Sequence, residues 1–109
     1  MLAKRLFCFG FESPTEAKSN ASYGTDFESS SCVWILSESD EEALAWGQII
    51  AERLVQSLFD RANVEAYSWI ETGFAYWIEQ DPDELCAARH MPVVGIGETP
   101  DFALLAARD

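Results

Sequence analysis

The residues best suited to chemistry are three cysteines and a single histidine, Cys8, Cys32, Cys86 and His90. Cys86 and His90 are four positions apart, which places them on one face of a helix if the helix continues that far. A thiolate beside an imidazole is a possible nucleophile and base. No oxyanion-hole or orienting motif accompanies the pair. We therefore interpret Cys86 as a buried structural thiol and His90 as a surface histidine, and we predict no catalytic residues.

The same four side chains have the ligand count of a Cys3His zinc site. Zinc modules place ligand pairs at short spacings such as C-x-x-C, which this sequence lacks. Cys8 and Cys32 lie instead within apolar, strand-like runs, where buried thiols behave as small hydrophobic side chains. We expect three reduced, metal-free thiols and no cofactor. Reduced thiols are typical of cytoplasmic proteins, and the cytoplasm is the compartment that we predict.

Carboxylates are the most abundant reactive groups, and they gather in two parts of the chain. No Lys or Arg occurs from Ser19 through Glu52, and the acidic residues of this stretch are Asp26, Glu28, Glu38, Asp40, Glu41, Glu42 and Glu52. The second cluster comprises Glu79, Asp81, Asp83 and Glu84. Neither cluster has the D-x-D-x-D-G spacing of a calcium loop. A chain of 109 residues also leaves little room for the cleft of a glycoside hydrolase.

The net charge of −12 limits the kinds of molecule that the protein could bind. Nucleic acid and anionic membranes would repel such a chain, so basic proteins and cationic ligands are the natural partners. No segment has the run of apolar residues that a membrane span requires. The composition, 49% hydrophobic and 24% charged, is that of an ordinary globular protein, and the length suits one domain spanning residues 1–109.

One helix organises the rest of the chain. Ser39 followed by Glu42 is a capping box, in which the hydroxyl accepts the Glu42 N–H and the Glu42 carboxylate reaches the Ser39 N–H. Acidic residues fill the first turn, where the helix dipole favours anions. Apolar residues then recur at three- and four-residue steps, which predicts an amphipathic helix over Ser39–Asp60. Gly47 lies on the apolar face and would let this helix approach a sheet closely.

Strand-like runs surround this helix. Residues 2–11 are apolar on both alternating faces, which favours a central strand, and residues 32–36 form a second strand that leads into the helix. Between them, residues 12–31 are rich in serine and predict a long loop, with Tyr23 and Phe27 pinning it to the body.

The second half of the chain contains shorter elements. Residues 65–70 and 74–79 flank Glu71-Thr72-Gly73, and two β-rich runs around a short turn indicate a hairpin. Asp81 and Pro82 are a typical N-cap and first helical residue, so a short helix should begin there and end near His90. A strand over residues 93–96 and a last helical turn over residues 102–107 complete the order.

The sequence thus predicts an α+β domain, with a mostly antiparallel sheet of four to five strands, the Ser39–Asp60 helix packed on one face, and a short second helix. We expect a small acidic interaction module that is not an enzyme and that neutralises a basic partner, as an immunity or antitoxin protein does to a toxin. The expected partner-binding residues are Asp40, Glu41, Asp81, Asp83, Tyr67 and Trp69. The alternative is a small-molecule-binding or regulatory domain, with the ligand between the aromatic sheet face and the 12–31 loop.

Overall fold

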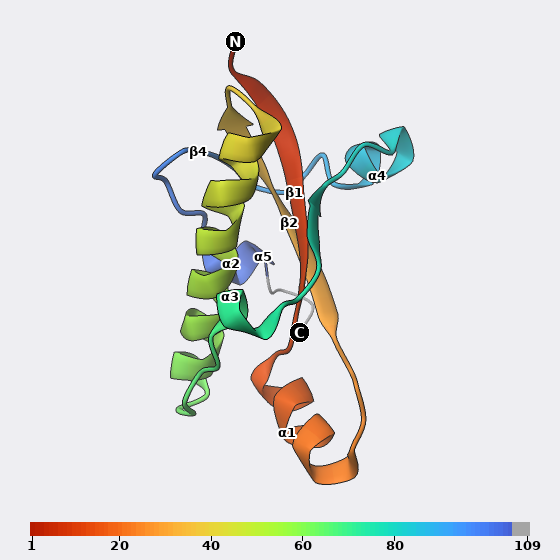
Figure 1. Ribbon diagram of the computed structural model, residues 1–109, viewed down its shortest axis with the longest axis vertical. Coiled ribbons are helices and arrows are strands. Elements are labelled where there is room, and N and C mark those ends of the chain that lie inside the picture. Colours follow the sequence, from red (N-terminus) through yellow and green to blue (C-terminus); the bar gives the residue numbers. More distant parts are fainter. Residues whose placement is uncertain (106–109) are drawn as a thin grey trace.

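The computed structural model describes residues 1–105. In this part of the chain the elements are β1 (Ala3–Phe11), α1 (Pro14–Tyr23), β2 (Ser29–Ser37), α2 (Asp40–Arg61), α3 (Trp69–Thr72), β3 (Tyr76–Ile78), α4 (Pro82–Ala87), β4 (Val93–Gly95) and α5 (Phe102–Leu105). They form a single α+β domain in which α2 crosses one face of the sheet (Figure 1). None of these helices combines the length and apolarity needed to cross a membrane.

The sheet has four strands in the order β3-β1-β2-β4. The predicted central position of the first strand is confirmed, because β1 pairs with β2 on one side and with β3 on the other, both antiparallel. The prediction of a mostly antiparallel sheet needs correction: β4 runs parallel to β2, so the sheet is mixed. Parallel neighbours need a long crossover, and the segment from α2 to α4 supplies it.

The α2 helix begins as predicted. Ser39 is its N-cap, and its hydroxyl accepts the backbone N–H of Glu42 at 3.1 Å. The return half of the predicted capping box is different, because the Glu42 carboxylate accepts the N–H of Glu38 at 3.0 Å instead of that of Ser39. The helix ends one residue later than expected, at Arg61.

The main core lies between α2 and the face of the sheet that it covers. Alternation along β1 and β2 sends one set of apolar side chains to this face, and the helix presents its apolar side to them. The fully buried members include Phe7, Phe9, Phe11, Val33, Ile35, Ile50, Leu54 and Val55. Burying each such side chain contributes about 1.5–3 kcal/mol, so this layer dominates the stability of the fold.

The predicted 12–31 loop is wrong, because half of it is the helix α1. Ser13 caps this helix with both halves of a capping box to Glu16, and Pro14 occupies the first turn. The last three residues of the 12–31 segment, from Ser29, belong to β2. Between helix and strand lies a turn closed by the Asn20 side chain, whose amide accepts the Phe27 N–H and donates to the Phe27 carbonyl, both at 2.9 Å. Tyr23 and Phe27 are exposed and do not pin the segment to the body. Local hydrogen bonds order this segment, and Ala17 of α1 packs against the main core.

The predicted hairpin is also wrong. Trp69–Thr72 forms the short helix α3, and β3 pairs with β1 instead of with the preceding run. The Trp69 indole N–H donates to the Gly10 carbonyl at 2.7 Å, and its ring meets Phe9 edge to face at 6.0 Å. Tertiary contacts of Trp69 therefore override the β propensity of residues 65–70.

The last three elements agree more closely with the predictions made from the sequence. Asp81 caps α4 by accepting the Asp83 N–H at 2.9 Å, as expected, but the helix ends at Ala87 instead of near His90. The strand predicted over residues 93–96 is β4. The last helical turn is confirmed as α5, Phe102–Leu105, and positions 106 and 107 of that prediction lie outside the described residues.

Candidate functional site

The second face of the sheet is only partly covered. Alternation sends Leu6 and Cys8 of β1 and Cys32 and Trp34 of β2 to this face, opposite the phenylalanines that α2 covers. The Trp34 indole N–H donates to the Ala88 carbonyl at 2.9 Å, which holds the segment after α4 against one end of the face. A cavity occupies the neighbouring surface.

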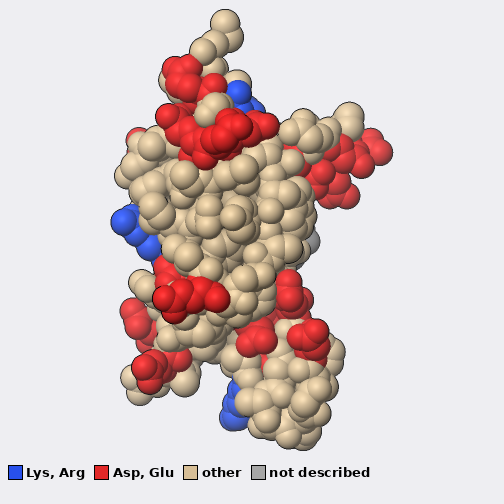
Figure 2. Space-filling view, viewed as in Figure 1, with Lys and Arg blue, Asp and Glu red and all other residues tan. Residues whose placement is uncertain are grey.

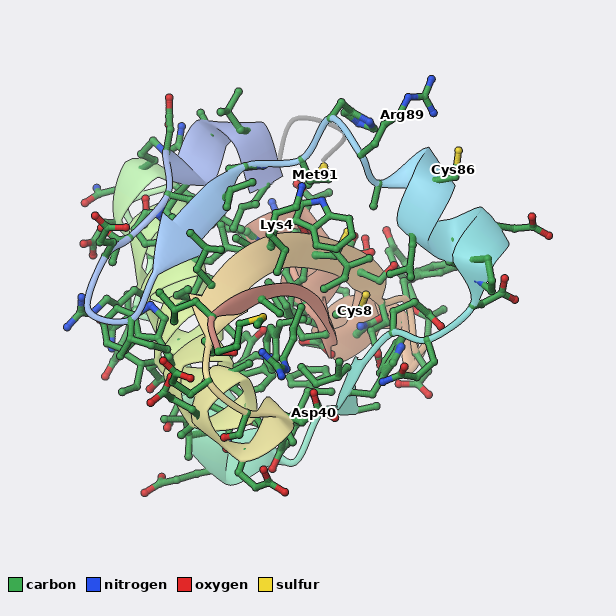
Figure 3. All side chains as sticks on the ribbon, turned by 90° about the horizontal axis from the view of Figure 1, so that it is seen from above. Lys4, Cys8, Asp40, Cys86, Arg89 and Met91 are labelled. Carbon is green, nitrogen blue, oxygen red and sulfur yellow. The ribbon has the colours of Figure 1, made fainter. Side chains whose placement is uncertain are left out.

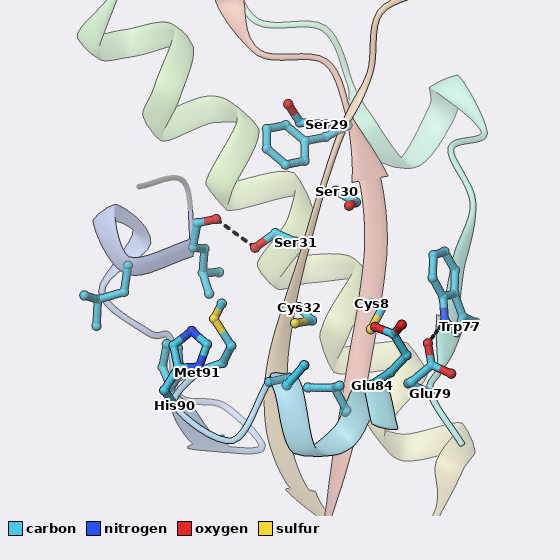
Figure 4. A pocket seen from close by; sticks show the side chains of 17 residues that line it. Cys8, Ser29, Ser30, Ser31, Cys32, Trp77, Glu79, Glu84, His90 and Met91 are labelled. Carbon is cyan, nitrogen blue, oxygen red and sulfur yellow. Dashed lines mark hydrogen bonds between the residues drawn. The ribbon is translucent and has the colours of Figure 1, made fainter. Parts of the chain in front are cut away.

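This cavity has a volume of about 730 Å³. Its floor is the sheet, and its walls come from α4 and the segment after it on one side and from α5 on the other (Figure 4). The Ser31 hydroxyl donates to the Leu105 carbonyl at 2.8 Å and fixes α5 as a wall. The size is that of a small-molecule or peptide side-chain site.

One rim of the cavity combines an indole with carboxylates. Trp77 of β3 lies opposite Cys8, and its indole N–H donates to Glu79 Oε1 at 3.1 Å. This bond and those from the backbone N–H groups of Asp81 and Gln80 lower the pKa of the Glu79 carboxyl. Glu84 of α4 lies on the same rim. An aromatic face beside ionised carboxylates favours a cationic group.

Two cysteines lie side by side on the cavity floor. Cys8 and Cys32 are cross-strand partners in the β1–β2 register, and both line the cavity (Figure 4). Cys8 is buried, whereas Cys32 is partly exposed. The pKa of the Cys8 thiol is raised well above its ordinary value by the Cys32 side chain beside it, by burial and by the charges of Glu79 and Glu84. Cys8 therefore keeps its proton at neutral pH.

The pair that the sequence suggested for nucleophilic catalysis is not assembled. The α4 helix stops at Ala87, so Cys86 and His90 do not share a helix face. His90 borders the cavity, whereas the exposed Cys86 thiol points outward and accepts a bond from the Arg89 guanidinium at 3.6 Å (Figure 3). Cys86 is thus an exposed thiol and not the buried one that we expected. Within residues 1–105, no cluster of three or more His, Cys, Asp or Glu side chains is arranged to hold a metal ion.

The four predicted acidic residues lie at the starts of α2 and α4, both in the upper half of Figure 1. The Asp40 carboxylate accepts the Nε–H of the Arg5 guanidinium at 2.8 Å, and the Asp81 carboxylate accepts the Asp83 N–H as the N-cap of α4. Glu41 and Asp83 are exposed, and the described residues offer their side chains no hydrogen bond or ion pair. We call Asp40, Glu41, Asp81 and Asp83 the acidic end.

Few of the carboxylates are neutralised within the fold. In the described part of the chain only two ion pairs occur, between the N-terminal ammonium and Glu38 and between Arg5 and Asp40. Other basic side chains are engaged elsewhere, with Lys4 over the Trp34 ring and Arg53 over the Trp46 ring. Figure 2 shows acidic side chains over the start of α2 and over α4, separated by neutral surface, and further acidic side chains in the lower half of the view.

The two aromatic residues that we expected to anchor a partner have structural roles. Trp69 is 2% exposed and belongs to the core. Tyr67 is half-buried, and its hydroxyl both accepts the N–H of Glu12 and donates to the Glu12 carbonyl. Trp77, which is 42% exposed, is the aromatic side chain available at a site. In the sequence, the strand-like alternation of residues 76–78 was the only sign that Trp77 could be exposed at a site. Its place beside the cavity depends also on the pairing of β3 with β1.

The chain matches no family model, no curated protein and no solved structure. The cavity and the acidic end are the candidate binding features of the described residues.

Proposed function

We propose that this protein binds a basic partner protein through the acidic end and neutralises it, as an immunity or antitoxin protein does to a toxin. The observation that carries the proposal is the exposure of Glu41 and Asp83, which have no partner among the described residues. Unneutralised carboxylates at the starts of two helices give a field that attracts a basic surface and steers its approach. We place this activity in the cytoplasm, where protein thiols are mostly reduced and disulfides are transient.

The test uses association kinetics with a purified partner. A partner is first captured from native lysate at low salt and released at high salt. The variant Glu41→Gln/Asp83→Asn removes two charges from the acidic end but leaves the Arg5–Asp40 ion pair and the Asp81 cap in place. We expect its association rate at low salt to fall several-fold, with the difference vanishing near 1 M salt, where the Debye length is about 3 Å.

The matched control removes the same charge from the other end of α2. Asp60 and Glu65 are exposed, and the variant Asp60→Asn/Glu65→Gln has the same net charge as the test variant. Equal slowing by the two variants would show that only net charge matters, and it would overturn the acidic end as the docking surface. Inhibition of the partner's activity by the wild-type protein then tests neutralisation directly.

A specific observation supports a second candidate function, the binding of a small cationic ligand. The cavity offers the Trp77 ring and the carboxyl groups of Glu79 and Glu84 on one rim, and an apolar floor that includes Leu6. Aromatic faces and carboxylates together recognise organic cations. Calorimetric titration with small aliphatic amines tests this function, and Trp77→Leu and Glu84→Gln should each weaken binding.

A further inference from the structure

Cys8 and Cys32 are cross-strand partners, and the hydrogen bonds of β1 show which kind of pair they form. The Gly10 N–H donates to the Ala75 carbonyl and the Glu79 N–H donates to the Leu6 carbonyl, so the even-numbered residues of β1 direct their backbone groups toward β3. Cys8, at an intervening even position, therefore forms a non-hydrogen-bonded pair with Cys32 of β2.

Non-hydrogen-bonded pairs bring side chains closest across an antiparallel ladder, with the two Cα atoms about 4.5 Å apart. This separation falls within the range that disulfides span, roughly 4.4–6.8 Å, at its short end. The partial exposure of Cys32 on the cavity floor leaves room for its side chain to adjust as the bond forms. The backbone is thus already placed for a cross-link.

We propose that Cys8 and Cys32 form a reversible intramolecular disulfide, so that the floor of the cavity is a site of thiol oxidation. The oxidant is a small disulfide such as oxidised glutathione, which reaches Cys32 through the cavity. This inference does not depend on the proposed binding of a basic partner.

The reaction follows from the different exposure of the two thiols. The Cys32 thiolate attacks one sulfur of the small disulfide, forms a mixed disulfide and releases the other half as a thiolate. Cys8 then attacks Cys32 Sγ, its proton passes to the departing sulfur, and the second half leaves as a thiol. Two protein thiols are oxidised by two electrons, and the small disulfide is reduced to two thiols. Cys8 is more deeply buried than Cys32 and so less accessible to the small disulfide, which makes it the resolving residue; it reacts as the thiolate when its proton leaves.

The position of the pair makes the bond reversible and gives it a structural effect. The bond would face the cavity through the partly exposed Cys32, and exposed disulfides are reduced readily. The bond would join β1 to β2 at the base of the segment that contains α1. Oxidation would therefore restrain α1 and its turn, and would remove both thiols from the cavity floor.

The experiment uses the full-length variant Cys86→Ser, which lacks the exposed thiol but keeps the pair. The folded protein is equilibrated with oxidised glutathione, and remaining thiols are counted by alkylation after denaturation in acid. We expect both thiols to be lost without a change in the far-ultraviolet circular dichroism, a Cys8–Cys32 cross-linked peptide in the digest, and full recovery with dithiothreitol.

Two single-cysteine variants separate the steps. Cys8→Ala/Cys86→Ser should stop at the mixed disulfide on Cys32, and Cys32→Ser/Cys86→Ser should keep its remaining buried thiol reduced. The Cys86→Ser protein decides the question by itself, even if a variant at the buried position 8 does not fold. Retention of both its thiols, or a mixed disulfide on Cys32 beside a reduced Cys8, would overturn the proposal.

Discussion

Gly47 of α2 lies directly against the ring of Phe7 in β1, and a Cβ atom at position 47 would overlap the ring. Both residues are buried, with Phe7 at 0% exposure. The missing side chain therefore sets the distance between the helix and the sheet, as the sequence had suggested.

Because the added Cβ would overlap the Phe7 ring, we expect Gly47→Ala to reach the upper part of the overpacking cost of about 1–3 kcal/mol, which leaves a net loss of stability. The higher helix propensity of alanine, worth about 1 kcal/mol, only partly offsets this cost. Urea unfolding measures the difference, with the exposed Gln56→Ala on the same helix as the control. If Gly47→Ala were as stable as the wild type, α2 would not pack on Phe7 as closely as the structure has it.

Ser39→Ala removes the acceptor of the Glu42 N–H at the start of α2. The loss of this N-cap should lower the free energy of unfolding by about 0.5–2 kcal/mol. Ser39→Asp supplies another capping acceptor and should recover most of the loss. Chemical denaturation of the three proteins checks the order, and equal losses in both variants would show that the hydroxyl itself, and not a capping acceptor, is required.

Leu54 is fully buried in the middle of α2. Leu54→Ala should cost about 2–5 kcal/mol, because it removes apolar contacts and leaves a cavity. Ile49 of the same helix is 38% exposed, so Ile49→Ala is the matched control and should cost much less. Thermal or urea unfolding measures both, and similar values would contradict the assignment of the buried face.

Glu28 gives a prediction that depends on pH. Desolvation raises the pKa of its carboxyl, and repulsion from Asp26, Glu12 and Glu16 raises it further. A carboxyl with a raised folded-state pKa contributes stability that is fully present below its unfolded-state pKa and is lost as pH rises through the folded-state pKa. Ionised Glu28 therefore destabilises the fold at neutral pH.

Glu28→Gln should raise the free energy of unfolding slightly at neutral pH, since the side chain is mostly exposed and solvent screens its charge. The gain should disappear below the ordinary glutamate pKa of about 4.3, where both side chains are neutral. Urea unfolding at both pH values checks this, with the exposed Glu65→Gln as a control for net charge. A gain that persists in acid would assign the effect to packing.

The sequence by itself determined the features that arise from contacts within a few residues. The Ser39 cap, the apolar face of α2 and the Asp81-Pro82 start of α4 follow from hydrogen bonds and spacing within one helix. Ser13 and Glu16 are a signal of the same kind for α1, but the surrounding serines obscured it.

The tertiary structure alone decided the strand partners and therefore the cavity. The β propensity of residues 65–70 did not lead to a hairpin, because the indole of Trp69 docks on the Gly10 carbonyl and ends the strand-like run in a helix. The pairing of Cys8 with Cys32 and of Cys8 with Trp77 joins residues from three separate strands. Strand pairing depends on distant segments meeting in one register, and local sequence carries little information about which segments those are.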